Sequence, residues 1–275
     1  NPIDLLASGI SAATHTNVVS PTFLDEVAMG HHPTIPSHLS HLLYHKREAG
    51  VASGIVNAPD RSFNPQIDPY LPEEYGPRRH HTIKPKLKKD LQKRLLLKED
   101  PSVPILFWPS RLDPIQKGCS LLADILFQLI NDYNHLGLQI VMIADGPYQQ
   151  HFQGIVAHHG ISDRIAVQPF SESLSHLGYG GSDFVLMPSS FEPCGLPQMI
   201  GCRYGSLPIA HATGGLKDTV RHLNIHENTG NGFLFEHFTT DGFRWAIDQA
   251  MEFYQLSPDH KNPQIKRIME QSKED

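Results

Sequence analysis

Five short apolar runs, separated by helical patterns, most restrict the fold of this chain. The runs are nearly continuous in apolar residues, as expected for strands that are covered on both faces. They occupy residues 104–108, 138–143, 165–167, 184–187 and 207–210. Amphipathic helical patterns lie between most of them, the clearest at residues 118–130, and another follows at 243–253. This alternation predicts an α/β fold, a Rossmann-like parallel sheet flanked by helices, with ligands bound at the carboxyl ends of the strands.

Residues 1–75 have an irregular pattern, and a basic helical stretch follows at 87–97. A strand-like segment at 17–20 precedes loops rich in Pro, His and Gly, and six prolines between 59 and 85 argue against a long helix there. Leucines at 87, 91, 95 and 96 predict one buried face on a basic helix. We expect residues 1–75 to form a partial N-terminal segment and connector, 76–102 a linker with the basic helix, and 103–275 the main domain.

Composition excludes several classes of protein. Hydrophobic residues make up 39% of the chain, and no apolar run reaches the roughly 20 residues of a membrane-spanning helix. The net charge of -6 argues against general attraction to nucleic acid. The three cysteines show no paired framework, which favours a reducing compartment. The chain starts at Asn1 without a secretory signal pattern, and we expect further residues upstream.

Eighteen histidines invite a metal-site hypothesis. His41 and His45 have the i, i+4 spacing of one helix face, but no Glu-flanked zinc signature or cysteine accompanies them. We interpret the His-rich segment, which also holds residues 31, 32 and 38, as a solvated loop. The basic run at 84–94 has the charge for a nucleic-acid or glucan contact, but Asp90 interrupts it and its leucines fit an ordinary amphipathic helix. We interpret it as a solvated face.

Two glycine-containing loops follow the last two apolar runs, each just before a helical pattern. They are Ser189–Leu196 and Thr213–Leu216. Helix N-termini expose unpaired N–H groups and partial positive charge, which suits an anionic diphosphate. Glu192 can accept hydrogen bonds from sugar hydroxyls. Because these strand ends converge on one crevice, the sequence predicts a site for a sugar that carries phosphates.

Other strand ends add candidate groups. Arg111 and Lys117 can neutralise a diphosphate, although surface cations are more often simply solvated. The turn at 144–147 lets the backbone approach a ligand closely, and Phe170 is either a stacking partner for a nucleobase or a packing residue. For Glu192 two interpretations are about equal. It is a first-turn acid that stabilises a helix, or it contacts a transferred sugar and its developing positive charge.

Three motifs stand in a recognisable order and spacing. They are Arg111-Leu112 with Gln116-Lys117-Gly118, Phe191-Glu192-Pro193-Cys194-Gly195-Leu196, and Thr213-Gly214-Gly215-Leu216-Lys217-Asp218-Thr219-Val220. Together they resemble the donor half of bacterial glycogen synthases and plant starch synthases, the ADP-glucose-type glucosyltransferases of the GT-B fold. Upstream, Val19-Ser20-Pro21-Thr22-Phe23, Gly54-Ile55-Val56-Asn57 with Asp60, and Phe63-Asn64-Pro65 also resemble the family, so the resemblance spans nearly all of residues 9–255.

The resemblance implies retaining transfer of glucose from ADP-glucose to the 4-OH end of an α-1,4-glucan. It implies no cofactor and no metal, and the sequence has no Asp-x-Asp to hold one. Arg111 and Lys117 would bind the diphosphate, Glu192 would contact the glucose, and Phe170 stands where the family has an aromatic near the adenine. The donor site would be walled by Gly195, Leu196, Thr213, Gly214 and Gly215. We expect a nucleotide-sugar donor and a glucan acceptor, no nucleic acid and no membrane, in a bacterial cytoplasm or a plastid stroma.

The chain also departs from the family pattern. Family members carry an acceptor domain with a Lys-x-Gly-Gly loop ahead of the matched segment, and a Ser-Trp segment after the last helix. The family's Asn-Gly-Val-Asp turn is Asn57-Ala58-Pro59-Asp60 here, and the spacer between Arg111 and Lys117 is one residue longer. We therefore expect residues 1–75 to be the tail of the acceptor domain with its connector, and 103–275 to be the donor-binding domain, inactive alone.

Two alternatives stay open. The chain is a non-catalytic GT-B-derived binding or scaffold module, or it is a GT-B glycosyltransferase with another donor or acceptor, such as a sucrose-type or lipopolysaccharide enzyme. The sequence does not decide between ADP-glucose and UDP-glucose.

Overall fold

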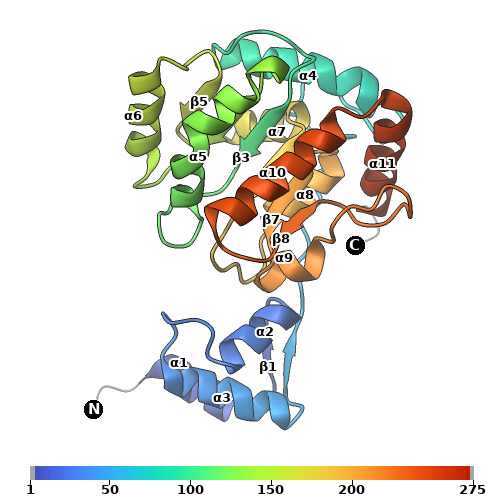
Figure 1. The fold of residues 1–275 in the computed structure, drawn as a ribbon. Helices are drawn as coiled ribbons and strands as arrows, with labels where there is room; N and C mark the ends of the chain where they lie inside the picture. The colour runs from blue at the N-terminus through green and yellow to red at the C-terminus, as the bar shows by residue number, and fades with distance from the viewer. Residues whose placement is uncertain (1–3, 273–275) are drawn as a thin grey trace.

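The computed structural model describes residues 4–272. They form a small N-terminal part and a larger domain, joined by a connector at residues 55–79 (Figure 1). In the small part, β1 and β2 pair in parallel, with Asn17 opposite Ser53. Helix α2 packs over this pair through Leu24 and Val27, which meet Leu43 in a small apolar cluster. The elements are α1 (Leu5–Ala12), β1 (Thr16–Val18), α2 (Pro21–Ala28), α3 (Ser37–Glu48) and β2 (Ala52–Gly54).

The larger domain is built on a six-stranded parallel sheet in the order β5-β4-β3-β6-β7-β8. Chain order reverses between β3 and β6, which places a topological switch point there. The predicted Rossmann-like α/β fold is confirmed, although β8 is not among the predicted runs. The strands are β3 (Ile105–Trp108), β4 (Gln139–Ile143), β5 (Ile165–Gln168), β6 (Phe184–Met187), β7 (Leu207–His211) and β8 (Phe233–Phe235).

Helices cover both faces of this sheet. Alternate residues of a strand point to opposite faces, so Leu106 and Trp108 join one buried cluster and Ile105 and Phe107 the other. The first cluster receives α5 (Cys119–Asp132), α6 (Gln149–His159) and α10 (Thr240–Tyr254). The second receives α4 (His80–Arg94), α7 (Glu172–Gly181), α8 (Pro197–Tyr204) and α9 (Gly214–Thr219). The remaining elements are the 3-10 turn η1 (Asn134–Leu136) and α11 (Pro258–Gln271), which contributes to both clusters.

Helix α4 corrects the interpretation of the basic run as a solvated face for two of its lysines, whereas Lys86, Lys89, Lys93 and Arg94 are exposed as expected. Lys84 and Lys88 are buried. The Lys84 Nζ donates to the carbonyl oxygens of Gly180 (2.9 Å) and Tyr204 (3.0 Å), so one ammonium stabilises the C-terminal ends of α7 and α8. Lys88 Nζ donates to Asp183 Oδ2 at 2.6 Å.

Two other expectations for this segment are wrong. The six prolines argue against a long helix, yet the last of them, Pro85, lies inside the 15-residue helix α4. Leu87, Leu91 and Leu95 are buried as predicted, but Leu96 is 86% exposed because the chain leaves the helix there with a positive φ of 56°.

The connector between the two parts is fixed to the larger domain by buried polar bonds. Asp68 is fully buried, and its Oδ2 accepts from His176 Nδ1 (2.7 Å) and from the Tyr204 hydroxyl (2.5 Å). The Tyr75 hydroxyl donates to Tyr204 O at 2.7 Å, and the ring of Phe63 stacks on His176 at 4.6 Å. The connector therefore packs against the larger domain and contributes to its buried interior. None of the helices within residues 4–272 has the length and apolar character to cross a bilayer.

Candidate functional site

The loops that follow β3 and β6 meet at the switch point of the sheet. Ser190 N–H donates to Gln116 O at 2.7 Å, and Ser190 Oγ donates to Ile115 O at 2.9 Å. Gly118 adopts a positive φ of 72°, and a Cβ there would overlap the Pro188 carbonyl oxygen. A side chain at this position would push the two loops apart, so glycine brings Lys117 against the β6 loop.

Lys117 and Glu192 form a direct ion pair at this junction. Lys117 Nζ lies 2.5 Å from Glu192 Oε2, and their side chains are only 12% and 8% exposed. Ser189 Oγ donates to the same carboxylate oxygen at 3.0 Å. Two residues that the sequence singled out from motifs 75 positions apart are thus in contact. In such a buried pair each charge compensates the other, and the pair holds the carboxylate near the carboxyl end of β6.

Arg111 stands on the same loop but is exposed. Its side chain reaches Gln116 Oε1 at 3.3 Å, and no carboxylate in the described part of the chain pairs with it. Asp113 shapes the loop by accepting the N–H groups of Gln116 (2.8 Å) and Ile115 (2.9 Å). The Gln116 N–H holds the pKa of Asp113 below its usual range, which keeps this acceptor ionised. Arg111 therefore presents a solvent-exposed cation on the same loop as Lys117.

Phe170 lies at the end of β5, at one edge of the sheet. It is 59% exposed, and its N–H donates to Asp145 Oδ1 at 3.1 Å. Three strand intervals separate β5 from β6, or about 14 Å at the usual strand spacing. Phe170 is therefore mostly exposed rather than packed in the core, and its stacking on a nucleobase stays a prediction.

The Thr213 loop meets the Glu192 loop through two glycines. A Cβ at Gly214 would overlap Glu192 O, and one at Gly215 would overlap Cys194 O. Gly215 N–H donates to Glu192 O at 2.9 Å. The predicted wall residues Gly195, Leu196, Thr213, Gly214 and Gly215 thus lie on two loops that pack backbone to backbone, with the contact made by Gly214 and Gly215 against Glu192 and Cys194.

The expectation that both loops present unpaired N–H groups is wrong for the Thr213 loop. Gly214 N–H donates to Glu26 Oε1 at 3.0 Å, Gly215 N–H to Glu192 O, and Leu216 N–H to Thr213 O at 3.0 Å. In the Glu192 loop, by contrast, the N–H groups of Gly195 and Leu196 have no acceptor among residues 4–272. Only this second loop has backbone donors available to an anion or a sugar oxygen.

Sequence reasoning missed the contribution of α2. Glu26 accepts from Thr213 and Gly214, and Thr22 Oγ1 donates to Asp218 Oδ1 at 2.6 Å. The segment at 19–23 was noted for its resemblance, but nothing in it signals a partner almost two hundred positions away. His32 was assigned to a solvated loop, yet it is buried, with Nε2 3.2 Å from Glu26 Oε2. The other four histidines of that segment are exposed, at positions 31, 38, 41 and 45, but the last three lie on helix α3 rather than in a loop.

His211, at the end of β7, is a further buried group that the motifs did not reveal. Its Nδ1 lies 2.8 Å from Ser189 O, so it ties the end of β7 to the start of the Glu192 loop. Burial lowers the pKa of His211 below its ordinary 6.5, which favours the neutral ring. Burial likewise raises the pKa of the Cys194 thiol, which favours its neutral, less nucleophilic form.

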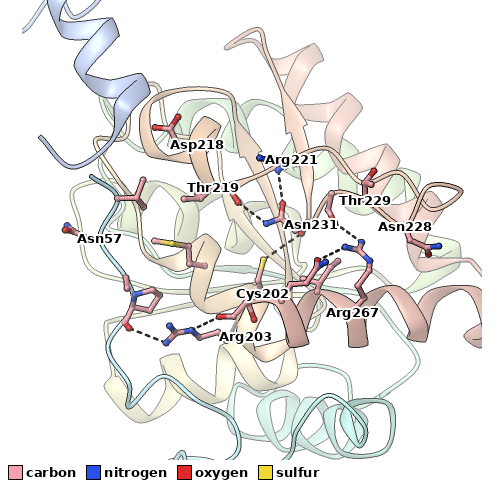
Figure 2. A pocket seen from close by; sticks show the side chains of 18 residues that line it. Asn57, Cys202, Arg203, Asp218, Thr219, Arg221, Asn228, Thr229, Asn231 and Arg267 are labelled. Atoms are coloured by element: carbon pink, nitrogen blue, oxygen red, sulfur yellow. Dashed lines mark hydrogen bonds between the residues drawn. The ribbon is translucent and has the colours of Figure 1, made fainter. Parts of the chain in front are cut away.

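A cavity of about 680 Å³ lies elsewhere, between residues 56–59 of the connector, α8 and α11 (Figure 2). Arg203, Arg221 and Arg267 line it, and Figure 2 shows Arg203 and Arg267 already engaged with the surrounding chain. None of the predicted site residues lines this cavity. Within residues 4–272 no group of three or more His, Cys, Asp or Glu side chains is placed to hold a metal ion.

Comparison with known proteins is consistent with this geometry. Residues 88–266 match the model of the family described as glycosyl transferases group 1. The chain belongs to this family. Glycogen synthase of Bacillus subtilis is 35% identical over 256 residues, which cover 92% of this chain and 50% of that protein. Glycogen synthase of Exiguobacterium sibiricum is 36% identical over 272 residues, covering 98% of this chain and 53% of that protein.

Solved structures of glycosyltransferases share the fold. The catalytic domain of starch synthase IV from Arabidopsis thaliana, bound to ADP and acarbose, matches with a TM-score of 0.83 and 31% identity over 96% of this chain and 53% of that chain. The Anabaena protein HepE in complex with UDP matches at a TM-score of 0.62 and 17% identity, covering 95% of this chain and 59% of that one, which shows the fold alone. The predicted resemblance to glycogen and starch synthases is confirmed. The chain spans about half the length of these relatives.

Proposed function

We propose that this glycosyltransferase chain is the donor-binding portion of a retaining glucosyltransferase of the glycogen and starch synthase type. It would take glucose from ADP-glucose to the 4-OH end of an α-1,4-glucan, in a bacterial cytoplasm or a plastid stroma. The contact between Lys117 and Glu192, with Arg111 beside it at the switch point, is the observation that carries the proposal.

Each group has a role that its position supports. Arg111 and Lys117 would pair with the diphosphate, Arg111 through two parallel hydrogen bonds and Lys117 as a point charge. These cations stabilise the negative charge that develops on the leaving nucleoside diphosphate. Phe170, at the far edge of the sheet, would stack on the base.

Glu192 would face the transferred glucose. When the diphosphate draws the Lys117 ammonium, the carboxylate becomes available to sugar hydroxyls and to the positive charge that develops at the anomeric carbon. The N–H groups of Gly195 and Leu196 are the backbone donors of this wall, with the Thr213 loop behind them. No protein-bound metal enters this scheme, because Arg111 and Lys117 supply the positive charge.

Calorimetry with ADP tests the proposal directly. We expect the chain to bind ADP and ADP-glucose, and the double variant Arg111→Ala with Lys117→Ala to bind ADP about 100-fold more weakly. No binding at millimolar ADP, or unchanged binding by the double variant, would refute the donor-site assignment. UDP and UDP-glucose in parallel titrations decide the nucleotide.

A separate acceptor domain decides between an enzyme and a binding module. We expect glucan synthesis when this chain is mixed with an acceptor domain from one of its glycogen synthase relatives, and none from either part alone. ADP binding without synthesis in the mixture would favour the scaffold alternative.

A further inference from the structure

Helix α2 brings a carboxylate from the small N-terminal part into the proposed donor site. Glu26 Oε1 accepts from Thr213 Oγ1 (3.0 Å) and from Gly214 N–H (3.0 Å), and Oε2 also lies 3.1 Å from Thr213 Oγ1. The Glu26 side chain is only 18% exposed. Figure 1 shows α2 directly against α9, where the small part meets the larger domain. The Glu26 carboxylate therefore caps the N-terminal end of α9.

Because of this contact, the Thr213 loop binds a carboxylate of the protein itself and not a phosphate. The hydroxyl and the first amide of α9 are the donors that a phosphate oxygen would seek, and here a carboxylate already takes them. A diphosphate that approached this loop would also meet the negative charge of Glu26. A diphosphate is therefore not expected at the Thr213 loop, and Arg111 and Lys117 on the β3 loop are the cations available to it.

Glu26 also reaches the Glu192 loop along two routes. Through the backbone, it fixes Gly214, and the adjacent Gly215 N–H holds Glu192 O at 2.9 Å. Through side chains, His32 Nε2 lies 3.2 Å from Glu26, and the His32 ring meets Phe191 edge-on at 5.5 Å. The first route ends on the Glu192 backbone and the second on the side chain of the neighbouring Phe191.

We infer that Glu26 is a positioning residue that holds the Thr213 loop as a wall for the sugar and fixes the backbone of Glu192. The inference rests on the proposed function. It assigns to the small N-terminal part a role in recognising the glucosyl group, while the nucleotide diphosphate is held by the larger domain alone.

The test compares binding of ADP with binding of ADP-glucose. In Glu26→Ala we expect ADP to bind within about twofold of the unaltered chain, and ADP-glucose to bind about tenfold more weakly. Glu26→Gln keeps an oxygen acceptor for Thr213 and Gly214, so it should recover most of the lost affinity. Thr22→Val is the matched control, since it removes a hydrogen bond between the same two helices without touching either loop. It should leave both affinities within about twofold.

Amide hydrogen exchange gives a readout that needs no ligand. We expect Glu26→Ala, but not Thr22→Val, to speed exchange at the hydrogen-bonded amides of residues 214–216, of which the Gly215 amide reports the contact with Glu192 O. Equal weakening of ADP and ADP-glucose, or equal effects of Glu26→Ala and Thr22→Val, would overturn the inference, because both describe a merely structural contact. Unchanged exchange at these residues in Glu26→Ala would overturn it as well. If the unaltered chain fails to bind ADP, the proposed function fails. Amide hydrogen exchange then still tests whether Glu26 fixes the two loops.

Discussion

The Glu192 loop and the Thr213 loop have similar positions in the fold, but their backbone N–H groups differ in hydrogen bonding. Each follows a buried strand, contains glycine and leads into a helix. In the Thr213 loop the first N–H groups of α9 are taken by Glu26, by Glu192 O and by the turn itself. In the Glu192 loop the N–H groups of Gly195 and Leu196 have no acceptor within residues 4–272. A helix N-terminus is thus an anion site only where tertiary contacts leave its donors unpaired.

The sharpest way to test this difference is to add one methyl group to each loop. Gly214→Ala places a Cβ onto the Glu192 carbonyl at a positive φ of 45°, and backbone cannot move aside cheaply. We expect a loss of about 4 kcal/mol in the free energy of unfolding. Gly195→Ala, at φ 71°, meets the Gln198 side chain, which can shift, so about 1 kcal/mol is expected. Urea unfolding measures both, and equal losses would contradict the packing described.

The second test removes the carboxylate of the Glu192 loop in a complete enzyme. We expect Glu192→Ala to lower kcat by about 10²–10³-fold and to change ADP affinity much less, because its contact is made mainly in the transition state. Steady-state kinetics with ADP titrations measures the two effects. A raised KM with normal kcat would reduce Glu192 to a ground-state contact.

The third test separates the two cations of the β3 loop. Lys117→Ala leaves the Glu192 carboxylate, which is 8% exposed, without its ammonium partner, so we expect a loss of about 2 kcal/mol in unfolding free energy. Arg111→Ala removes an exposed cation that has no carboxylate partner among the described residues, and a change below about 0.5 kcal/mol is expected. Chemical unfolding without nucleotide distinguishes the two. A larger loss for Arg111→Ala would show that the ion pair does not hold this loop.

The smallest effect concerns pH and the His211 bond between β7 and the Glu192 loop. Because burial lowers the folded-state pKa of His211, the unfolded chain gains its proton first as pH falls below about 6.5. Stability should therefore fall as pH drops from about 6.5 toward 5, by less than about 1 kcal/mol from this group. Unfolding of His211→Gln across this range should show a shallower slope than the unaltered chain. Parallel slopes would assign the pH dependence to other histidines.

Much of the fold follows from local sequence pattern. The five apolar runs coincide with β3 to β7 because strands buried on both faces must be almost wholly apolar. Strand β8 has only three residues, Phe233–Phe235, and gives too short a pattern to detect. The burial of Lys84 and Lys88 was not predicted, because a lysine in a sequence pattern is normally taken to be solvent-exposed. In the fold, Lys84 donates hydrogen bonds to carbonyl groups at the ends of two helices.

The site was predictable as a set of loops but not as a network. Because each motif follows a strand, the sequence predicted that Arg111, Lys117, Glu192 and the Thr213 loop lie at the carboxyl ends of the parallel strands. Their roles remain predictions. Glu26 and His32 could not be found, because their partners lie far along the chain and no local period encodes such a contact.

The buried bonds of the connector decide where this chain can be divided. By composition, a fragment of the larger domain would start near residue 76. Such a fragment would lose Asp68, leaving His176 and Tyr204 with unpaired polar groups in the interior, and it would lose the apolar side chains of Leu71 and Tyr75 from the core. A fragment meant to fold alone should therefore begin upstream of Phe63, so that the whole anchored connector travels with the sheet.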